Sequence, residues 1–270
     1  MTRQVPTAEF ASLVYGRAGV PLDDSAEAFH EASRLYPNIA PRRLAALRAL
    51  ATSPELQQTV LRSGRTHTQR PQIDLPEREL PRSSLWDLLR TRRSKLESPG
   101  RSLGLGALSA LLHASYAASP REPEGTRRPV PSGGALYPLE LYVLALEVEG
   151  LERCVSHYNP FRHSLEVLAS VERADVGRSL VDPALADRAA ALIVVTAMFW
   201  RSRFKYGPRG YRFALLEAGH LMQNAVLAAT SLEIDALPLG GFYDRRLDSL
   251  IGADGLDEAS VYALLLGGRG

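Results

Sequence analysis

The stretch Ala190-Ala-Leu-Ile-Val-Val-Thr-Ala-Met-Phe199 is a continuous apolar run, interrupted only by one threonine. Its centre, at positions 193–196, consists of β-branched residues. A run of this kind, without alternation of polar and apolar positions, is typical of a β-strand that is covered on both faces. We therefore expect residues 190–199 to form a central strand of the fold.

The sequence on either side of this run predicts further strands and several helices. Apolar segments with high β-propensity predict strands at residues 139–148, 154–158, 164–168 and 260–266. Helical patterns predict helices at residues 83–93, 107–118 and 211–232. Helices and strands are intermixed without a regular βαβ alternation, so the fold class is α+β.

The first 80 residues differ in character from the rest of the chain. Residues 1–62 are predicted to form short helices, and Ser53-Pro54-Glu55 has the features of a helix start. Residues 65–81 are polar and contain three prolines, which indicates a linker or an extended arm rather than a packed element. We therefore divide the chain into a helical N-terminal extension with its linker, residues 1–80, and a main domain, residues 81–270.

The composition is typical of a globular protein in a reducing compartment. The 270 residues are 45% apolar and carry a net charge of +2, with scattered arginine pairs that form no continuous nucleic-acid stripe. The single cysteine excludes an internal disulfide. Cys154, His157 and His163 lack a fourth ligand, so we expect no metal site among them. Neither a secretory signal nor a membrane-spanning run is present, and a cytoplasmic protein is expected.

Only two of the 32 basic residues are lysines, Lys95 and Lys205. Arginine keeps its proton in proteins, whereas a lysine can lose its proton in a buried site and act as a base. Codon bias explains Lys95 equally well. Lys205 is followed directly by Tyr206 in a turn that ends at Gly207, so an amine and a phenol can be coupled there. Lys205 and Tyr206 are therefore the candidate proton-transfer residues.

Four segments offer groups for an anionic or flat ligand. Arg92-Arg93-Ser94-Lys95 gathers cations at a helix end, where they also favour the helix dipole. Pro131-Ser132-Gly133-Gly134 and Pro238-Leu239-Gly240-Gly241 allow backbone amides to approach a ligand, or merely turn the chain. Arg269 follows the last predicted strand, where it clamps a phosphate or belongs to a frayed tail.

The long helix carries polar residues inside an otherwise apolar run. Glu217, His220 and Asn224 are spaced to lie near one face, and buried polar groups need partners. We expect them to satisfy one another across a subunit interface rather than to act in catalysis. The sequence contains neither a P-loop, nor a complete dinucleotide fingerprint, nor a GxSxG nucleophile elbow.

Taken in order, five segments resemble those of the nitroreductase-like flavoproteins. They are Arg-Arg-Ser (92–94), Pro-Ser-Gly-Gly-Ala-Leu-Tyr-Pro-Leu-Glu-Leu-Tyr (131–142), His-Tyr-Asn-Pro (157–160), Lys-Tyr-Gly (205–207) and Glu-Ala-Gly-His-Leu-Met-Gln-Asn (217–224). The resemblance covers about residues 83–269. It is closer to the branch that oxidises azolines, the thiazolines and oxazolines of modified peptides. Residues 1–80 also look like an extension that many of these proteins carry.

This resemblance implies a central, mostly antiparallel sheet flanked by helices, and FMN bound at the interface of a homodimer. The residues that match the family's FMN-binding positions are Arg92, Arg93, Ser94, Ser132, Gly133, Gly240, Gly241 and Arg269. The loop with Ser132 and Gly133 typically reaches across from the partner subunit. Leu96 stands where the wider family often has a basic residue, so Lys95 substitutes for it or the phosphate relies on Arg269.

The pair Lys205 and Tyr206 is what the azoline-oxidising branch has and general nitroreductases usually lack. It implies oxidation of thiazolines or oxazolines to thiazoles or oxazoles in a ribosomally made peptide. Lys205 or Tyr206 would accept a proton, FMN a hydride, and oxygen is the expected final electron acceptor. The implied partners are the azoline-containing precursor peptide and a cyclodehydratase, with residues 1–80 docking the cyclodehydratase or the peptide leader. Two alternatives stay open: an NAD(P)H-dependent nitro or quinone reductase, and a non-catalytic scaffold of a peptide-modifying complex.

Overall fold

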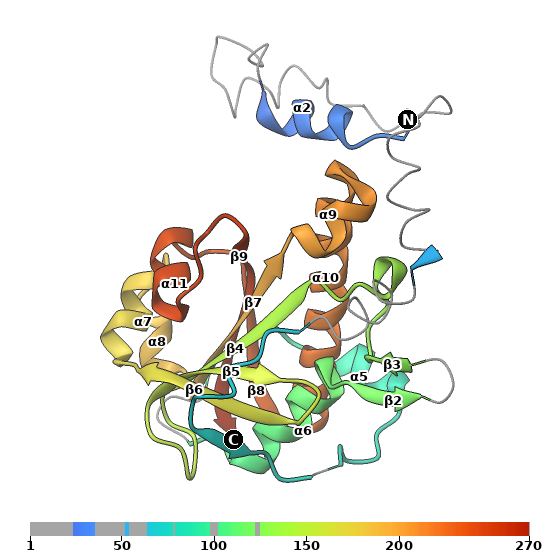
Figure 1. Cartoon of the computed structure of the whole chain (residues 1–270). Coiled ribbons are helices and arrows are strands. Elements are labelled where there is room, and N and C mark those ends of the chain that lie inside the picture. Colours follow the sequence, from blue (N-terminus) through green and yellow to red (C-terminus); the bar gives the residue numbers. More distant parts are fainter. Residues whose placement is uncertain are drawn as a thin grey trace, which may run out of the picture.

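A seven-stranded antiparallel sheet forms the centre of the computed structural model, which describes residues 24–35, 52–53, 64–77, 79–97, 102–121 and 125–269. The expected α+β class is confirmed, and helices flank the sheet (Figure 1). In the order in which they lie side by side, the strands are β1 (Gln72–Asp74), β6 (Ser164–Ser170), β5 (Cys154–Asn159), β4 (Leu139–Ala145), β7 (Ala191–Met198), β9 (Glu258–Arg269) and β8 (Ile234–Leu239). Two further short strands, β2 (Ser119–Arg121) and β3 (Gly125–Arg127), pair separately.

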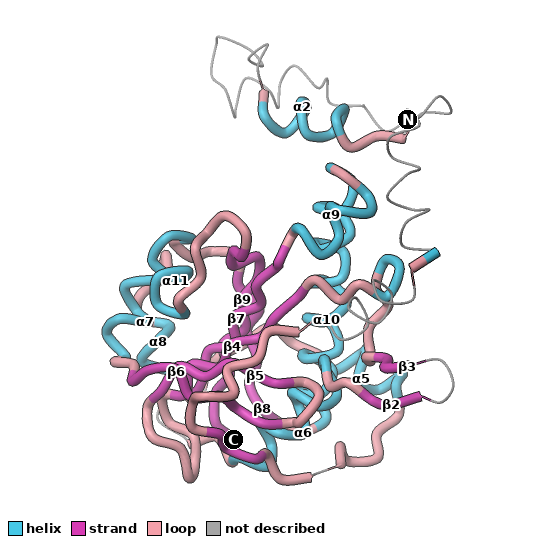
Figure 2. The backbone as a smooth tube through the Cα atoms, in the orientation of Figure 1, coloured by secondary structure: helices cyan, strands magenta, loops and turns pink. Residues whose placement is uncertain are grey.

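The apolar run at residues 190–199 is strand β7, and both of its faces are covered as predicted. Ile193 and Val195 contribute to one core cluster of buried side chains, which includes residues of α6 (Leu105–Tyr116) and α10 (Pro208–Ser231). Leu192 and Val194 point the other way, into a second cluster. Successive side chains of a strand alternate between faces, so a strand between two helical layers must be apolar at every position. The tube in Figure 2 shows β7 and β4 running through the middle of the molecule.

The second helical layer consists of three short helices that the sequence patterns did not predict. They pack against the face of the sheet opposite to α6 and α10. With four to eight residues each, they are too short to show a clear helical period. They are α7 (Arg173–Ser179), α8 (Leu185–Arg188) and α11 (Asp244–Ile251).

The expected linker at residues 65–81 instead contributes to the sheet and to the core. β1 pairs with β6, and Leu75 is buried. The prolines misled the prediction because a strand at the edge of a sheet tolerates flanking prolines. The division of the chain at residue 80 stays a prediction. Most of residues 1–62, expected to form short helices, and most of the helix expected to start at Ser53 lie outside the described residues.

One helix of the N-terminal extension, α2 (Ser25–Ala32), is described, and it contacts the beginning of α10. The ring of Phe29 makes an edge contact with Tyr211 at a centroid distance of 5.2 Å. The guanidinium of Arg212 donates hydrogen bonds to Ser33 Oγ at 2.7 Å and to the carbonyl oxygen of His30 at 2.8 Å. Helix α2 is thus held next to the helix that carries Glu217.

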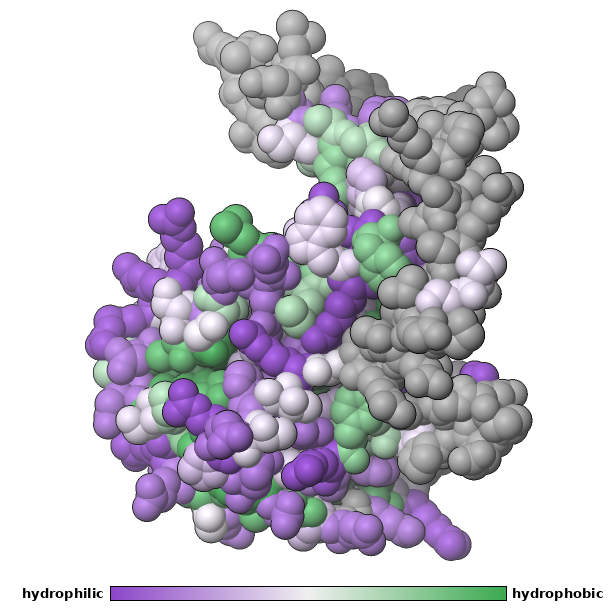
Figure 3. Space-filling view, in the orientation of Figure 1, coloured by the Kyte–Doolittle hydropathy of each residue, from purple (hydrophilic) through white to green (hydrophobic). Residues whose placement is uncertain are grey.

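The surface in Figure 3 is mostly hydrophilic, with hydrophobic side chains in small areas between polar ones. The amphipathic helix predicted at 83–93 is α5 (Leu85–Thr91), but its apolar residues are not buried within the chain. Leu85, Trp86 and Leu89 are 63%, 68% and 49% exposed. None of the described helices combines the length and the apolar character needed to cross a membrane.

Candidate active site

Lys205 and Tyr206 lie in the last turn of helix α9 (Trp200–Tyr206), where we had expected an isolated turn. The predicted end at Gly207 is correct: its φ of 57° breaks the helix, and Pro208 begins α10. α9 and α10 meet so closely that a Cβ on Gly210 would lie 2.6 Å from the carbonyl carbon of Ser202. The two candidate residues therefore project from a helix end that is fixed against the long helix.

The loop that contains Ser132 and Gly133 has an unusual backbone. Its 3₁₀ turn spans Gly133–Ala135, and the φ angles of Gly134, Ala135 and Tyr137 are 70°, 55° and 43°. Non-glycine residues in this left-handed region are strained, and such strain is common at functional sites. The hydroxyl of Ser132 accepts a hydrogen bond of 2.9 Å from the backbone N–H of Tyr137, which closes the loop on itself.

This loop and the end of α9 converge at Gly134. A Cβ built on Gly134 would lie 2.6 Å from Tyr206 Oη and 2.7 Å from Lys205 Nζ. Lys205 Nζ is 5.2 Å from the centroid of the Tyr206 ring, which in turn makes an edge contact with Phe213 at 4.9 Å. Both side chains are half-buried. An amine and a phenol thus share one position beside a glycine that leaves room for them.

Glu217 of α10 is buried against α6, at 2% exposure. The hydroxyl of Tyr116 donates a hydrogen bond of 2.7 Å to its Oε1. His220 is exposed, and Asn224 donates to a loop carbonyl oxygen at 3.3 Å. The expectation that these three residues meet one another across a subunit interface is wrong for Glu217, which faces the core of its own chain and finds its partner on another helix.

Burial raises the pKa of Glu217 to about 7, although the neighbouring Ser132 and Tyr116 hydroxyls oppose the shift. The unfolded chain loses this proton near pH 4.5, whereas the folded protein keeps it up to about pH 7. Stability relative to a Glu217→Gln variant should therefore fall by about 3 kcal/mol as the pH rises through this window. Urea unfolding at several pH values measures this difference. An exposed control, Glu152→Gln, should show no such trend; equal trends in both variants would contradict the assignment.

The arginine segment predicted to bind phosphate lies against the edge of the sheet that β8 forms. The backbone N–H of Lys95 donates to the carbonyl oxygen of Ala236 at 3.0 Å, and Arg92 Nη1 donates to Ser94 Oγ at 3.3 Å. β9 extends to Arg269, whose backbone pairs with Ile234 of β8. The cationic segment and the C-terminal arginine are thus brought to the same end of β8.

Lys95 itself is not set up as a base. Its ammonium lies 3.0 Å from Glu97 Oε2 and 3.2 Å from Asp235 Oδ1. Hydrogen bonds to Glu97 and to Asp235 raise the pKa of Lys95, so it stays a cation. Of the two lysines, only Lys205 stands beside a phenol.

Gly240 and Gly241 follow β8 at its other end. A Cβ on Gly240 would meet no atom within 4 Å, so the backbone there faces open space. The carbonyl oxygen of Gly241 accepts a hydrogen bond of 3.1 Å from Val181 N–H. Because six strand residues span about 20 Å, the two candidate ends of β8 are well separated.

The predicted site residues therefore form two groups within one chain. The proton-transfer group contains Lys205 and Tyr206 with the loop of Ser132 and Gly133. The ligand group lies along β8 and consists of Arg92, Arg93, Ser94, Gly240, Gly241 and Arg269. No hydrogen bond among the described residues joins one group to the other.

Prediction from the sequence missed a buried cluster of charges inside the sheet. His157 Nδ1 lies 2.9 Å from Glu166 Oε2, and its Nε2 lies 2.9 Å from Glu140 Oε2. Burial alone would raise the pKa of Glu140, but His157 and the guanidinium of Arg201 outweigh it and lower the pKa to about 2. Burial likewise opposes a raised pKa of His157, but the two carboxylates outweigh it. Glu140 and Glu166 stand inside the otherwise apolar strand segments 139–145 and 164–170, and this pattern could have indicated the cluster.

The three residues that we had considered and rejected as zinc ligands have separate partners. Cys154 Sγ lies 3.3 Å from Ser156 Oγ. His163 bonds through Nε2 to Ser109 at 2.7 Å and through Nδ1 to the hydroxyl of Tyr158 at 2.9 Å. His157 belongs to the carboxylate cluster instead.

Known proteins resemble this chain in sequence and in fold. The family model described as the nitroreductase family matches residues 99–268. The candidate nitroreductase MJ1384 of Methanocaldococcus jannaschii is 36% identical over 184 residues, which cover 67% of this chain and 89% of that protein. The microcin B17-processing protein McbC of Escherichia coli is 34% identical over 152 residues, and the match spans 54% of each chain.

A solved structure adds to the likeness with McbC. It is the E. coli microcin synthetase McbBCD complex with truncated pro-MccB17 bound. The matched chain superposes with a TM-score of 0.56 at 25% sequence identity, and the match covers 89% of this chain and 86% of that one. The resemblance that five short segments indicated is thus found over most of the chain.

Proposed function

This chain belongs to the nitroreductase family, and from that premise we propose that it is an FMN-dependent dehydrogenase that oxidises thiazolines or oxazolines in a ribosomally made peptide to thiazoles or oxazoles. The similarity to a microcin-processing protein supports a role in peptide modification. The observation that carries the proposal is the convergence of Lys205 Nζ and Tyr206 Oη on Gly134. Reduction of a nitro group needs no such base, whereas aromatisation of an azoline does.

The residues along β8 fit an FMN molecule. The Arg92–Ser94 segment offers guanidinium and hydroxyl donors of the kind that bind phosphate, and Arg269 ends the neighbouring strand. At the far end of β8, open space beside Gly240 allows a flat ring to approach the backbone. An elongated ligand with a phosphate at one end fits this layout.

In the proposed reaction, Lys205 or Tyr206 takes the proton from the ring carbon that was the amino-acid α-carbon. FMN, when bound, supplies the two-electron acceptor for the hydride from the neighbouring ring carbon. Lys205 acts as the base itself, or stays charged and stabilises the phenolate of Tyr206 as that group accepts the proton. The strained loop at Gly134 lies beside both groups.

Retention of FMN should depend on Arg92. In an Arg92→Ala variant, loss of a charge-assisted hydrogen bond should weaken FMN binding by about 1.5–3 kcal/mol, which is roughly 10- to 150-fold in Kd. Quenching of FMN fluorescence during titration measures Kd. Arg90→Ala removes an exposed arginine from the end of α5, two residues before Arg92, and should leave Kd unchanged. If both variants bind FMN like the wild type, the phosphate is not held by this segment.

We also propose a homodimer, completed by the loop of Ser132 and Gly133 from the partner. The exposed apolar side chains of α5 support it, because a second subunit would remove them from water. The separation of the candidate residues into two groups within one chain also supports it. Sedimentation equilibrium measures the oligomeric state, and a monomer at all concentrations would contradict this part of the proposal.

We further propose that the precursor peptide and a cyclodehydratase are partners, and that residues 1–80 dock the cyclodehydratase or the peptide leader.

The function is tested with the full-length protein and FMN on an azoline-containing peptide. We expect the loss of two hydrogens per ring by mass spectrometry, with consumption of oxygen. Reduction of a nitro compound or quinone by NAD(P)H without azoline oxidation would select the reductase alternative. A protein that binds no FMN and oxidises no azoline would favour the scaffold.

A further inference from the structure

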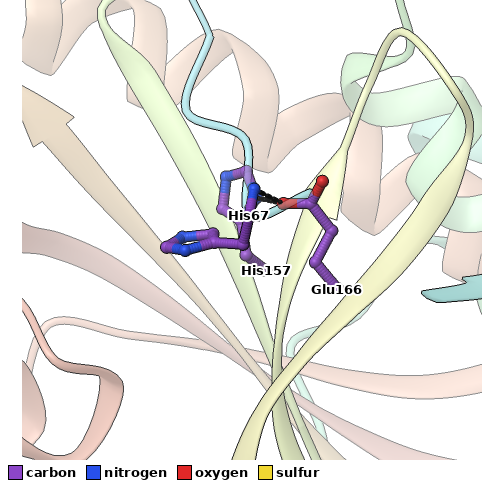
Figure 4. A group of neighbouring side chains, drawn as sticks. All are labelled: His67, His157 and Glu166. Atoms are coloured by element: carbon purple, nitrogen blue, oxygen red, sulfur yellow. Dashed lines mark hydrogen bonds and ion pairs between the residues drawn. The ribbon is translucent and has the colours of Figure 1, made fainter. Parts of the chain in front are cut away.

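We propose that His67, His157 and Glu166 form a binding site for a divalent transition-metal ion, with zinc as the best match. One ligand atom from each residue lies within 4.8 Å of the others. Figure 4 shows the three side chains together where the segment before β1 crosses β5 and β6. Two imidazoles and one carboxylate are ligands that zinc accepts, often with an open fourth position. This site lies outside the two groups of the proposed active site.

The surroundings orient the ligands as a metal site requires. The nitrogen of His157 that faces away from Glu166, Nε2, lies 2.9 Å from the carboxylate of Glu140. Glu166 Oε1 accepts a hydrogen bond of 2.9 Å from Asn159 Nδ2, which leaves Oε2 toward the two histidines. Metal-bound histidines usually donate their second ring N–H to a carboxylate, and ligating carboxylates are themselves hydrogen-bonded.

His67 provides an independent indication. Its Nε2 is buried and has no hydrogen-bond partner among the residues that the structure describes. The backbone N–H of His67 donates to Glu166 Oε2 at 2.8 Å, which holds the residue in place from the main chain. Buried polar atoms are almost always satisfied, so an unpartnered ring nitrogen beside two other ligand atoms points to a missing partner.

The charges around the cluster also favour a cation. Three carboxylates, those of Glu140, Glu166 and Glu258, lie around the two imidazoles, and the guanidinium groups of Arg65 and Arg201 bind Glu258 and Glu140. With neutral imidazoles, three negative charges stand against two positive ones. A bound divalent ion would offset this excess of negative charge.

The site is open to one side and joins segments that are distant in sequence. His67 lines a cavity of about 320 Å³, together with Arg65, Arg70 and Tyr142, so a water molecule has room to complete the coordination. His157 and Glu166 belong to neighbouring strands, whereas His67 belongs to the segment that leads into β1. A bound ion would fasten this segment to the sheet.

Metal analysis of the untagged, full-length protein tests the site. The protein is treated with a chelator, dialysed, and titrated with Zn²⁺ or with Co²⁺, whose visible d–d bands report the coordination. We expect one ion per chain. His67→Gln should weaken binding by at least about 10-fold. The matched control His113→Gln, which removes an exposed imidazole elsewhere, should bind like the wild type.

Proteolysis gives a second readout that does not depend on activity. Trypsin cleaves after arginine unless proline follows, so the Arg65–Thr66 bond, two residues before His67, is a cleavage site, whereas Arg70 precedes Pro71 and is not. Zn²⁺ should slow cleavage after Arg65 in the wild type and in His113→Gln, but not in His67→Gln. The proposal is overturned if the wild type binds no more metal than His67→Gln, or if His113→Gln loses the ion as well.

Discussion

The Lys205→Arg variant is expected to bind FMN as the wild type does and to lose azoline oxidation, with kcat lower by about 10²- to 10⁴-fold. Arginine keeps the positive charge but cannot give up its proton, so it cannot accept one from the substrate. The amine of Lys205 is half-buried beside Tyr206, and a Cβ on Gly134 would lie 2.7 Å from it. The measurement is single-turnover oxidation of an azoline peptide, with FMN content determined from the visible spectrum.

The reverse exchange in the same helix serves as the control. Arg203→Lys also keeps the charge, and Arg203 lies over the ring of Trp200 at 4.5 Å, with no contact to Gly134. We expect it to oxidise azolines at close to the wild-type rate. Full activity of Lys205→Arg together with loss of activity in Tyr206→Phe would contradict lysine as the base and assign that role to the phenol.

Gly134→Ala is expected to reduce kcat by about 10²-fold while the protein stays folded. The new Cβ would lie 2.6 Å from Tyr206 Oη and 2.7 Å from Lys205 Nζ, which is closer than real contacts allow. Both atoms are the far ends of side chains that can move aside, so the clash displaces the proton-transfer pair rather than the backbone. Alanine at a φ of 70° adds a backbone cost of about 1–2 kcal/mol.

Gly150→Ala is a control that separates the two effects of Gly134→Ala, the steric clash and the backbone strain. Gly150 has a φ of 76°, and a Cβ there would meet nothing within 4 Å. The control should therefore lose stability by a similar amount in urea unfolding and keep its kcat. If Gly150→Ala loses as much activity as Gly134→Ala, backbone strain explains the result. In that case the convergence of Lys205 and Tyr206 on the loop has no catalytic meaning.

The longer elements of the fold could be predicted because their patterns are local. The strand at 190–199 and the helix at 211–232 match β7 and α10 within a few residues. The short helices α7, α8 and α11 were not predicted, because one or two turns do not establish a helical period in the sequence. Strand β1 was not predicted, because the prolines around it indicate a linker as readily as an edge strand.

The candidate site, too, could be predicted only in part. A lysine followed by a tyrosine, and an arginine pair followed by a serine, can be read directly as chemical groups. Their partners cannot be read in this way. Lys205 meets Gly134, and Tyr116 donates to Glu217, 101 positions away. Glu217 was expected at a subunit interface but faces the core, because the direction in which a helix residue points depends on what packs around the helix.

The sequence by itself determined the α+β class, the central buried strand and the resemblance to nitroreductase-like flavoproteins, because periodicity and ordered motifs are properties of the chain. Only the tertiary structure decided which side chains share a site. The topology of the sheet places β5 between β4 and β6, and the segment before β1 crosses these strands. His67 thereby reaches His157, and the imidazole of His157 lies between Glu140 and Glu166. Contacts over such separations depend on strand order and register, which a local pattern does not contain.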